Sequence, residues 1–226
     1  EGSVSIVDIT IGVSRLTQSN VTTLGFGGFN EADLLAKGIR KPNKNKTLAQ
    51  EMEPEYIAIS ENGTKAWVAL QENNAVAEID LTTKSFTNIW GLGTKDYSKP
   101  GNGFDASDKS GEILIANWPV KGYYMPDGIA TYTVDGTNYL VTANEGDEKE
   151  YGDFNERTTV GAVNLDPTKF PNASWLKEEQ NLGRFRITNA NGDTDNDGDF
   201  DELYAVGARS FSIFNTSTKQ LVFDSG

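Results

Sequence analysis

The chain has 226 residues, with 20 lysines and arginines against 33 aspartates and glutamates, so its formal net charge is −13. This charge repels phosphate backbones and anionic membranes, which excludes nucleic acid as an expected partner, and no apolar run is long enough for direct membrane insertion. Because the chain has no histidine and no cysteine, it lacks an imidazole base, a thiolate, a disulfide and a zinc site of the usual kind, and any bound metal must be held by oxygen atoms.

Short runs of alternating apolar residues, divided by Asn-Gly, Asp-Gly and Gly-Thr turns, predict an all-β fold. The expected elements in chain order are two closing strands in residues 1–25, a surface helix in 29–38 and a four-stranded antiparallel meander in 55–92. One or two irregular units follow in about 112–187, with a second short helix in 172–180 capped by Asn172, and opening strands lie in 203–224. Residues 94–110 and 144–155 are expected to form long polar loops.

Strands of one type recur at residues 3–10, 75–82 and 210–217, each closed by Asp or Asn and a turn rich in Thr or Ser. Recurring four-stranded meanders are typical of β-propeller blades. We therefore expect a partial β-propeller of about three to four blades with long loop insertions. Residues 1–226 would be a segment of a single propeller domain, incomplete at both ends and completed by the remainder of the same or another chain. The four tryptophans (Trp67, Trp90, Trp118 and Trp175) are expected to pack in the core or between blades.

The strongest chemical motif is an acidic loop in which aspartates alternate with other residues. Side chains at loop positions 1, 3, 5 and 9 are expected to converge on one point, and Gly198 allows the sharp turn that this requires. Carboxylates at this density favour a hard divalent cation, so the motif predicts a Ca²⁺ site, whereas a solvated acidic turn is the alternative. The predicted metal ligands are Asp193, Asp195, Asp197, Asp199 and Asp201.

Two weaker groups of acids are further candidates for metal binding. Glu55, Asp127 and Glu202 each precede the first strand of a repeat unit and could form a carboxylate ring at a propeller channel, although an acid at a strand entry is equally ordinary. Glu145 and Asp147 lie in an acidic loop that could hold a second ion or be merely solvated.

Several motifs, in order along the chain, resemble the choice-of-anchor I family. They lie in residues 53–60, 67–74, 115–119, 141–147, 181–184, 193–202 and 207–213. That family includes mesenchyme-specific cell surface glycoproteins of biomineralising animals and bacterial proteins labelled alkaline-phosphatase-like. The resemblance implies a secreted or surface-anchored β-propeller, longer than 226 residues, with bound calcium.

The sequence is compatible with two functions. The first is a secreted or cell-surface calcium-binding propeller with a structural, adhesion, mineral or assembly role and with a surface or extracellular-matrix assembly as partner. The alternative is a calcium-dependent phosphoester hydrolase of the alkaline phosphatase or phytase kind, in which Ca²⁺ holds phosphate and activates water. Arg157, Lys149 and Arg209 are the cations available to the alternative, but no catalytic residue is identified and we favour the non-enzymatic function.

Overall fold

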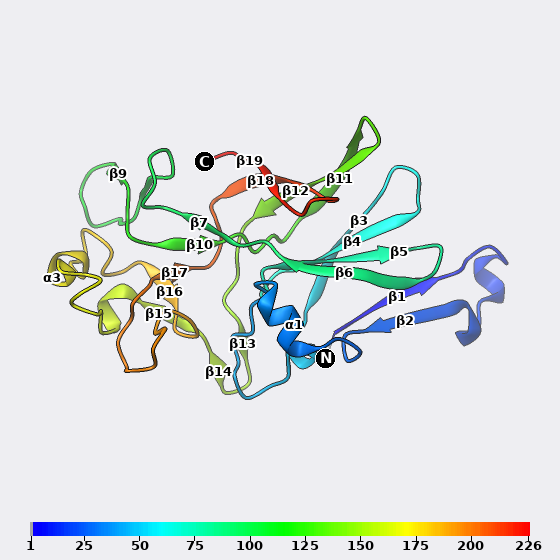
Figure 1. The fold of residues 1–226 in the computed structure, drawn as a ribbon, viewed down its shortest axis with the longest axis horizontal. Helices are drawn as coiled ribbons and strands as arrows, with labels where there is room; N and C mark the ends of the chain where they lie inside the picture. Colours follow the sequence, from blue (N-terminus) through cyan, green and yellow to red (C-terminus); the bar gives the residue numbers. More distant parts are fainter. Residues whose placement is uncertain (1) are drawn as a thin grey trace. The chain divides into compact units, whose positions relative to one another are not determined.

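The computed structural model describes residues 2–226, which form an all-β protein with three short α-helices (Figure 1). These residues divide into two compact units. Unit 1 combines residues 2–92, 126–143 and 212–224, and unit 2 combines residues 93–125, 144–211 and 225–226. The expected β class is therefore confirmed, and each unit has its own apolar core.

The central sheet of unit 1 is the meander that the sequence predicts. Its strands β3 (Pro54–Ile59), β4 (Lys65–Leu70), β5 (Ala75–Asp80) and β6 (Ser85–Gly91) are all antiparallel and lie in chain order. Short turns connect them, and Gly63, Asn74 and Lys84 adopt the positive φ angles that such turns require. Strands β4 and β5 are almost wholly buried, so this sheet forms the centre of the unit 1 core.

The second four-stranded sheet joins distant segments of the chain in the order β11 (Ile129–Val134), β12 (Thr137–Asn144), β18 (Ser210–Asn215) and β19 (Leu221–Asp224). The prediction that residues 203–224 open a separate blade was wrong. The chain between β12 and β18 packs mostly around the core of unit 2, so β18 and β19 complete the sheet that β11 and β12 begin.

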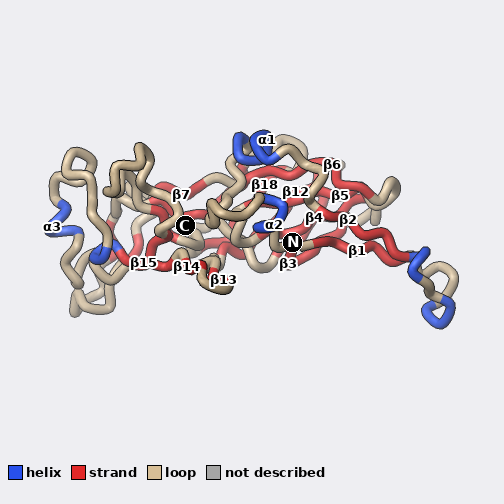
Figure 2. The backbone as a smooth tube through the Cα atoms, turned by 90° about the horizontal axis from the view of Figure 1, so that it is seen from below, coloured by secondary structure: helices blue, strands red, loops and turns tan. Residues whose placement is uncertain are grey.

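The N-terminal segment of unit 1 is an antiparallel ribbon of β1 (Ser3–Val7) and β2 (Val21–Gly25), whose connection contains the 3-10 helices η1 (Val13–Arg15) and η2 (Gln18–Asn20). The helix α1 (Glu31–Ala36) follows, with Asn30 as its N-cap, and the short helix α2 (Leu48–Glu51) precedes β3. The prediction had missed α2. Figure 2 marks α2 as a short helical segment, and a capping box between Thr47 and Gln50 defines its start.

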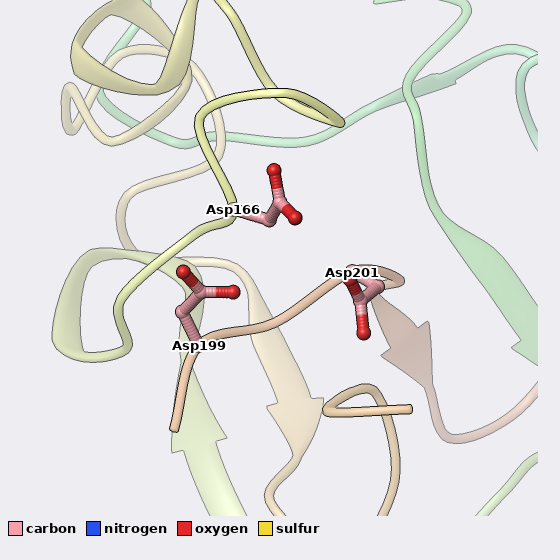
Figure 3. Close-up of side chains that lie close together, drawn as sticks. All are labelled: Asp166, Asp199 and Asp201. Carbon is pink, nitrogen blue, oxygen red and sulfur yellow. The ribbon is translucent and has the colours of Figure 1, made fainter. Parts of the chain in front are cut away.

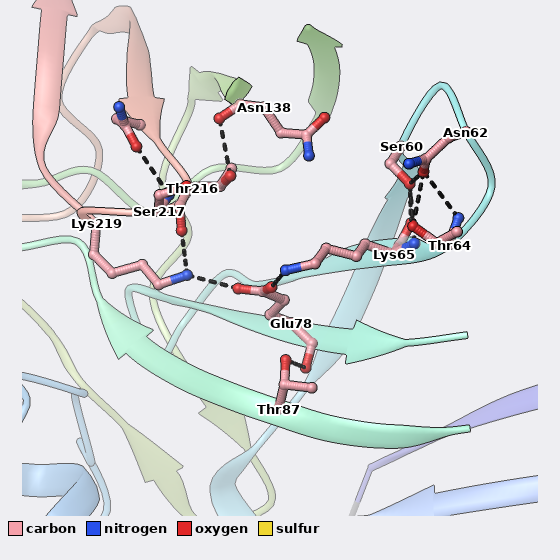
Figure 4. Close-up of polar contacts among 11 residues, drawn as sticks. Ser60, Asn62, Thr64, Lys65, Glu78, Thr87, Asn138, Thr216, Ser217 and Lys219 are labelled. Carbon is pink, nitrogen blue, oxygen red and sulfur yellow. Dashed lines mark hydrogen bonds and ion pairs between the residues drawn. The ribbon is translucent and has the colours of Figure 1, made fainter. Parts of the chain in front are cut away.

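A buried carboxylate connects the meander of unit 1 to the turn between β18 and β19, which carries Lys219. Glu78 on β5 is 5% exposed, and its two carboxylate oxygens accept from Lys65 Nζ (2.5 Å) and Lys219 Nζ (2.6 Å). Figure 4 shows the two ammonium groups approaching this carboxylate from different segments. Lys219 also lies 4.3 Å from the ring centroid of Trp90, so one lysine contacts both the charge and the aromatic side chain.

Unit 2 is built from very short strands around an aromatic core. Its three-stranded sheet has the order β17 (Tyr204–Ala205), β10 (Lys121–Tyr123) and β7 (Thr94–Asp96). The remaining strands form the pairs β8 (Phe104–Asp105) with β9 (Ile115–Ala116), β13 (Glu150–Tyr151) with β14 (Phe154–Asn155), and β15 (Arg157–Thr159) with β16 (Arg186–Thr188). The two predicted long loops therefore contain short strands.

Two local predictions in unit 2 need correction. The expected second surface helix, residues 172–180, is shorter in the structure and forms only α3 (Ala173–Leu176). The side chain of Asn172 makes no capping hydrogen bond with this helix. The 3-10 helix η3 (Val160–Ala162) precedes α3 in the chain. Trp67, Trp90 and Trp118 are buried as expected, but Trp175 is 48% exposed and stacks on Trp118 with the ring centroids 5.8 Å apart.

Candidate metal centre

The aspartate loop of unit 2 takes part in two groups of three carboxylates. Asp193, Asp195 and Asp197 form a first group in which one oxygen from each lies within 4.8 Å of the others. Asn196 (φ 63°) and Gly198 (φ 101°) turn the chain between and after these residues. The single cage stays a prediction, because the structure places Asp199 and Asp201 in a second group with another carboxylate.

The second group consists of Asp199, Asp201 and Asp166, again with one oxygen from each within 4.8 Å of the others (Figure 3). Asp166 was not predicted. It reaches the loop because Leu165 and Phe200 form a parallel β-bridge, in which Phe200 N donates to Asn164 O (2.9 Å) and Asp166 N donates to Phe200 O (3.1 Å). A segment more than thirty residues earlier in the chain thereby supplies a third carboxylate.

Backbone hydrogen bonds hold each carboxylate group in place. In the first group, Asp193 accepts from the backbone N–H of Asp197 and of Gly198, both at 3.2 Å. In the second group, Oδ2 of Asp201 accepts from Thr194 N (2.8 Å), and Oδ1 of Asp166 accepts from Lys169 N (3.0 Å). These hydrogen bonds fix the orientation of both carboxylates in the second group.

The electrostatics of the loop indicate an excess of negative charge. Partial burial and then the neighbouring carboxylate of Asp197 raise the pKa of Asp195. Partial burial followed by the charges of Asp197 and Asp166 raises the pKa of Asp199 as well. By contrast, the hydrogen bonds from Thr194 lower the pKa of Asp201. A bound cation would favour the ionised form of all these groups.

One atom in the second group has no partner of its own. Oδ1 of Asp199 is buried and accepts no hydrogen bond from any described residue. Asp199 as a whole is half-buried, and burying one of its carboxylate oxygens without a partner is unfavourable. The donor set is made entirely of carboxylate oxygens, which are the ligands that Ca²⁺ prefers, so the residues present fit a calcium ion.

The weaker candidate acids do not join either group. Glu55 lies on β3 rather than before it, and Asp127 and Glu202 each lie two residues before a strand, β11 and β17 respectively. Glu202 forms an ion pair with Lys121 (2.6 Å) and accepts from the hydroxyl of Tyr204.

The acidic-loop candidates Glu145 and Asp147 lie between β12 and β13. Within residues 2–226, the only close groups of three acids are the two that the aspartate loop forms.

The cations considered for phosphate binding are engaged elsewhere. The guanidinium of Arg157 forms an ion pair with Glu148 (3.3 Å), and Lys149 is buried. The guanidinium of Arg209 lies over the ring of Phe104, 5.1 Å from its centroid. These side chains therefore provide no observation that favours the hydrolase.

Comparison with known proteins identifies the class of protein. The chain belongs to the choice-of-anchor I family, whose domain matches residues 1–226, and this confirms the resemblance seen in the sequence. Membership of the family indicates a β-rich protein of the surface-anchored or extracellular type. Within residues 2–226, no helix is both long enough and apolar enough to cross a membrane.

Other comparisons add little. A search of curated proteins finds no match. Among solved structures, the chain is similar to hydrazine synthase of Kuenenia stuttgartiensis, with 15% sequence identity and a TM-score of 0.18. The similarity covers 76% of this chain and 36% of that chain, so this chain spans about a third of its length, and the TM-score is too low to define a shared fold.

Proposed function

We propose that this chain is part of a secreted or cell-surface β-propeller that binds Ca²⁺ and serves a structural, adhesion, mineral or assembly role. The observation that carries the proposal is the buried Oδ1 atom of Asp199, which lacks a partner and lies in a group of three carboxylates. Calcium would supply the missing partner and neutralise charges that otherwise repel one another.

The two carboxylate groups support two separate ion positions. Asp193, Asp195 and Asp197 would hold one ion at the exposed side of the loop. Asp166, Asp199 and Asp201 would hold the other and would connect the loop to the segment around Leu165. When bound, Ca²⁺ supplies positive charge and oxygen coordination, and its role here is to stiffen the loop rather than to activate water.

The propeller is supported by the two four-stranded sheets of unit 1, each of which has the strand number of a blade. The remaining blades would come from the remainder of the same or another chain. Electron cryomicroscopy of the full protein tests this point. Radial arrangement of these sheets about one axis is the expected result, and face-to-face packing of the two sheets as a sandwich would refute it.

Isothermal titration calorimetry with Ca²⁺ tests the metal sites. We expect the unsubstituted chain to bind two ions, and Asp197→Asn and Asp199→Asn to lose one ion each. Asp153→Asn is the matched control, because it removes the same charge from an exposed turn of unit 2. Absence of heat at millimolar Ca²⁺, or equal losses in the control, would refute calcium binding.

A further inference from the structure

The connection between β1 and β2 exposes an unusual number of apolar side chains. We call residues 7–16 the ribbon tip. In this segment Val7 is 44% exposed, Ile9 61%, Ile11 43% and Val13 74%. Contiguous exposed apolar residues mark interaction sites in soluble proteins.

The charge of the ribbon tip also differs from that of the chain. Asp8 and Arg15 are its only charged residues, so the tip is neutral in a chain with a net charge of −13. Arg15 forms no ion pair with any residue in the range 2–226, although acidic side chains greatly outnumber basic ones. A partner surface with a carboxylate beside an apolar depression would satisfy both features of the tip.

Unit 1 itself carries such a depression between α1 and α2, with a volume of about 400 Å³. Its inner wall contains the buried side chains of Phe26, Leu34, Leu48 and Met52. We call it the α1–α2 cavity. An apolar cavity of about 150 Å³ already accommodates benzene, so this one has room for more than one branched aliphatic side chain.

The polar residues that line the cavity complement the tip. They are Glu31, Thr47 and Gln50, and Glu31 is the charged one. The Glu31 carboxylate accepts from Lys41 Nζ (2.6 Å) and from Leu48 N (2.8 Å), which fixes its position. The side chain keeps an exposed fraction of 36%, so it remains accessible to a second cation such as the Arg15 guanidinium.

The tip cannot fill the cavity of its own molecule. Val7 pairs with Val21 at the tip end of the ribbon, and Ser3 pairs with Gly25 at the other end, directly before Phe26 of the cavity wall. Five paired residues separate the two ends by about 13–17 Å of hydrogen-bonded strand. Figure 1 and Figure 2 both show the ribbon extending away from α1.

We propose that the ribbon tip of one copy inserts into the α1–α2 cavity of a second copy, with Arg15 beside Glu31. This contact is head-to-tail, so every added copy leaves one free tip and one free cavity, and the assembly grows as a filament or closes as a ring. The proposal specifies the assembly role proposed above and involves no residue of the aspartate loop.

A mixing experiment tests the contact. The tip variant Ile9→Ser/Val13→Ser keeps the cavity, and the cavity variant Ala49→Phe, on the lining of the cavity, keeps the tip. In sedimentation velocity we expect the unsubstituted chain to grow beyond a dimer with concentration, and each variant alone to stay monomeric. An equimolar mixture of the two variants should form a 1:1 dimer and nothing larger. Ile113→Ser, at an 85% exposed position of unit 2, should assemble normally.

A substitution of Arg15 tests the contact independently of the cavity variant. Arg15→Glu changes only an exposed side chain, and it should weaken the self-association at least tenfold even if Ala49→Phe fails to fold. A monomer at every concentration, or a mixture that forms no dimer from two folded variants, would refute the proposal. Binding of the tip to phosphatidylcholine vesicles without self-association would also refute it. Sedimentation in EDTA and in Ca²⁺ separates a failure of this contact from a failure of calcium binding.

Discussion

The ion cluster around Glu78 provides a quantitative test of how unit 1 is held together. Lys219→Ala would remove one of two ammonium groups from a carboxylate that is 5% exposed. Removing the partner of a buried ion pair costs about 3–5 kcal/mol, but Glu78 keeps Lys65, so we expect a loss of about 2 kcal/mol. Lys65→Ala should cost less, about 0.5–1 kcal/mol, since the Lys65 side chain is 44% exposed and water screens its charge.

The free energy of unfolding is to be measured by urea denaturation with tryptophan fluorescence, in a background in which Trp118 and Trp175 of unit 2 are replaced by Phe so that the buried Trp67 and Trp90 report on unit 1. Lys44→Ala is the matched control, because it removes an equal charge from an exposed loop position and should change the free energy of unfolding by less than about 0.5 kcal/mol. The stabilising role of the Lys219–Glu78 pair is refuted if Lys219→Ala unfolds like the control or if Lys65→Ala is the more damaging substitution.

The same cluster predicts a pH dependence. Burial alone would raise the pKa of Glu78, but hydrogen bonds from Lys219 and Lys65 outweigh it and hold the pKa below the ordinary value of 4.5. A lowered pKa in the folded state stabilises the protein above the unfolded value, and this stabilisation is lost as the pH falls through the folded value. The difference in stability between the unsubstituted chain and Lys219→Ala should therefore be constant above about pH 5 and shrink below pH 4.5. A difference that persists at pH 2 would contradict this cause.

Three further outcomes are expected. Gly146→Ala should lower the melting temperature much more than Gly152→Ala: both positions have positive φ, but a Cβ at Gly146 would lie 2.1 Å from Gly207 N, whereas nothing lies within 4 Å at Gly152. Thr47→Ala should cost about 1 kcal/mol by urea denaturation, because it removes the N-cap of α2. In a phosphatase assay with the full protein, Ca²⁺ should produce no EDTA-sensitive turnover, while Ca²⁺ at about 100 times its dissociation constant should stabilise the fold by about 2.7 kcal/mol for each bound ion in calorimetry.

The parts of the fold that the sequence predicts well are those made by local contacts. The meander of β3 to β6 needs only short turns between neighbouring strands, and the alternation of apolar residues together with Asn62-Gly63 identifies them. The pairing of β12 with β18 is different, since unit 2 forms largely from the chain between them. No local sequence pattern identifies a strand partner so far along the chain. The sequence therefore predicts the strands of this second sheet as parts of two different blades.

In the candidate metal centre, too, the sequence identifies local features but not the contacts between distant segments. The spacing of the aspartates identifies the loop, but the positive φ angles of Asn196 and Gly198 divide it into two groups. Asp166 lies in an Asp-Pro-Thr-Lys sequence that is typical of a turn, and its Oδ1 atom indeed accepts from Lys169 N (3.0 Å). Only the bridge between Leu165 and Phe200 gives this turn residue a second role.

The two proposed sites lie on different units, and this separation has a physical consequence. The aspartate loop belongs to unit 2, whereas the ribbon tip and the α1–α2 cavity belong to unit 1. Calcium would stabilise the loop by neutralising like charges, whereas the tip contact depends on apolar burial and one ion pair. Because different forces act at the two sites and no residue belongs to both, their free energies should add, and substitutions at one site should leave the other unchanged. Chelation of Ca²⁺ should therefore lower the stability of unit 2 and leave the affinity of the tip for the cavity unchanged.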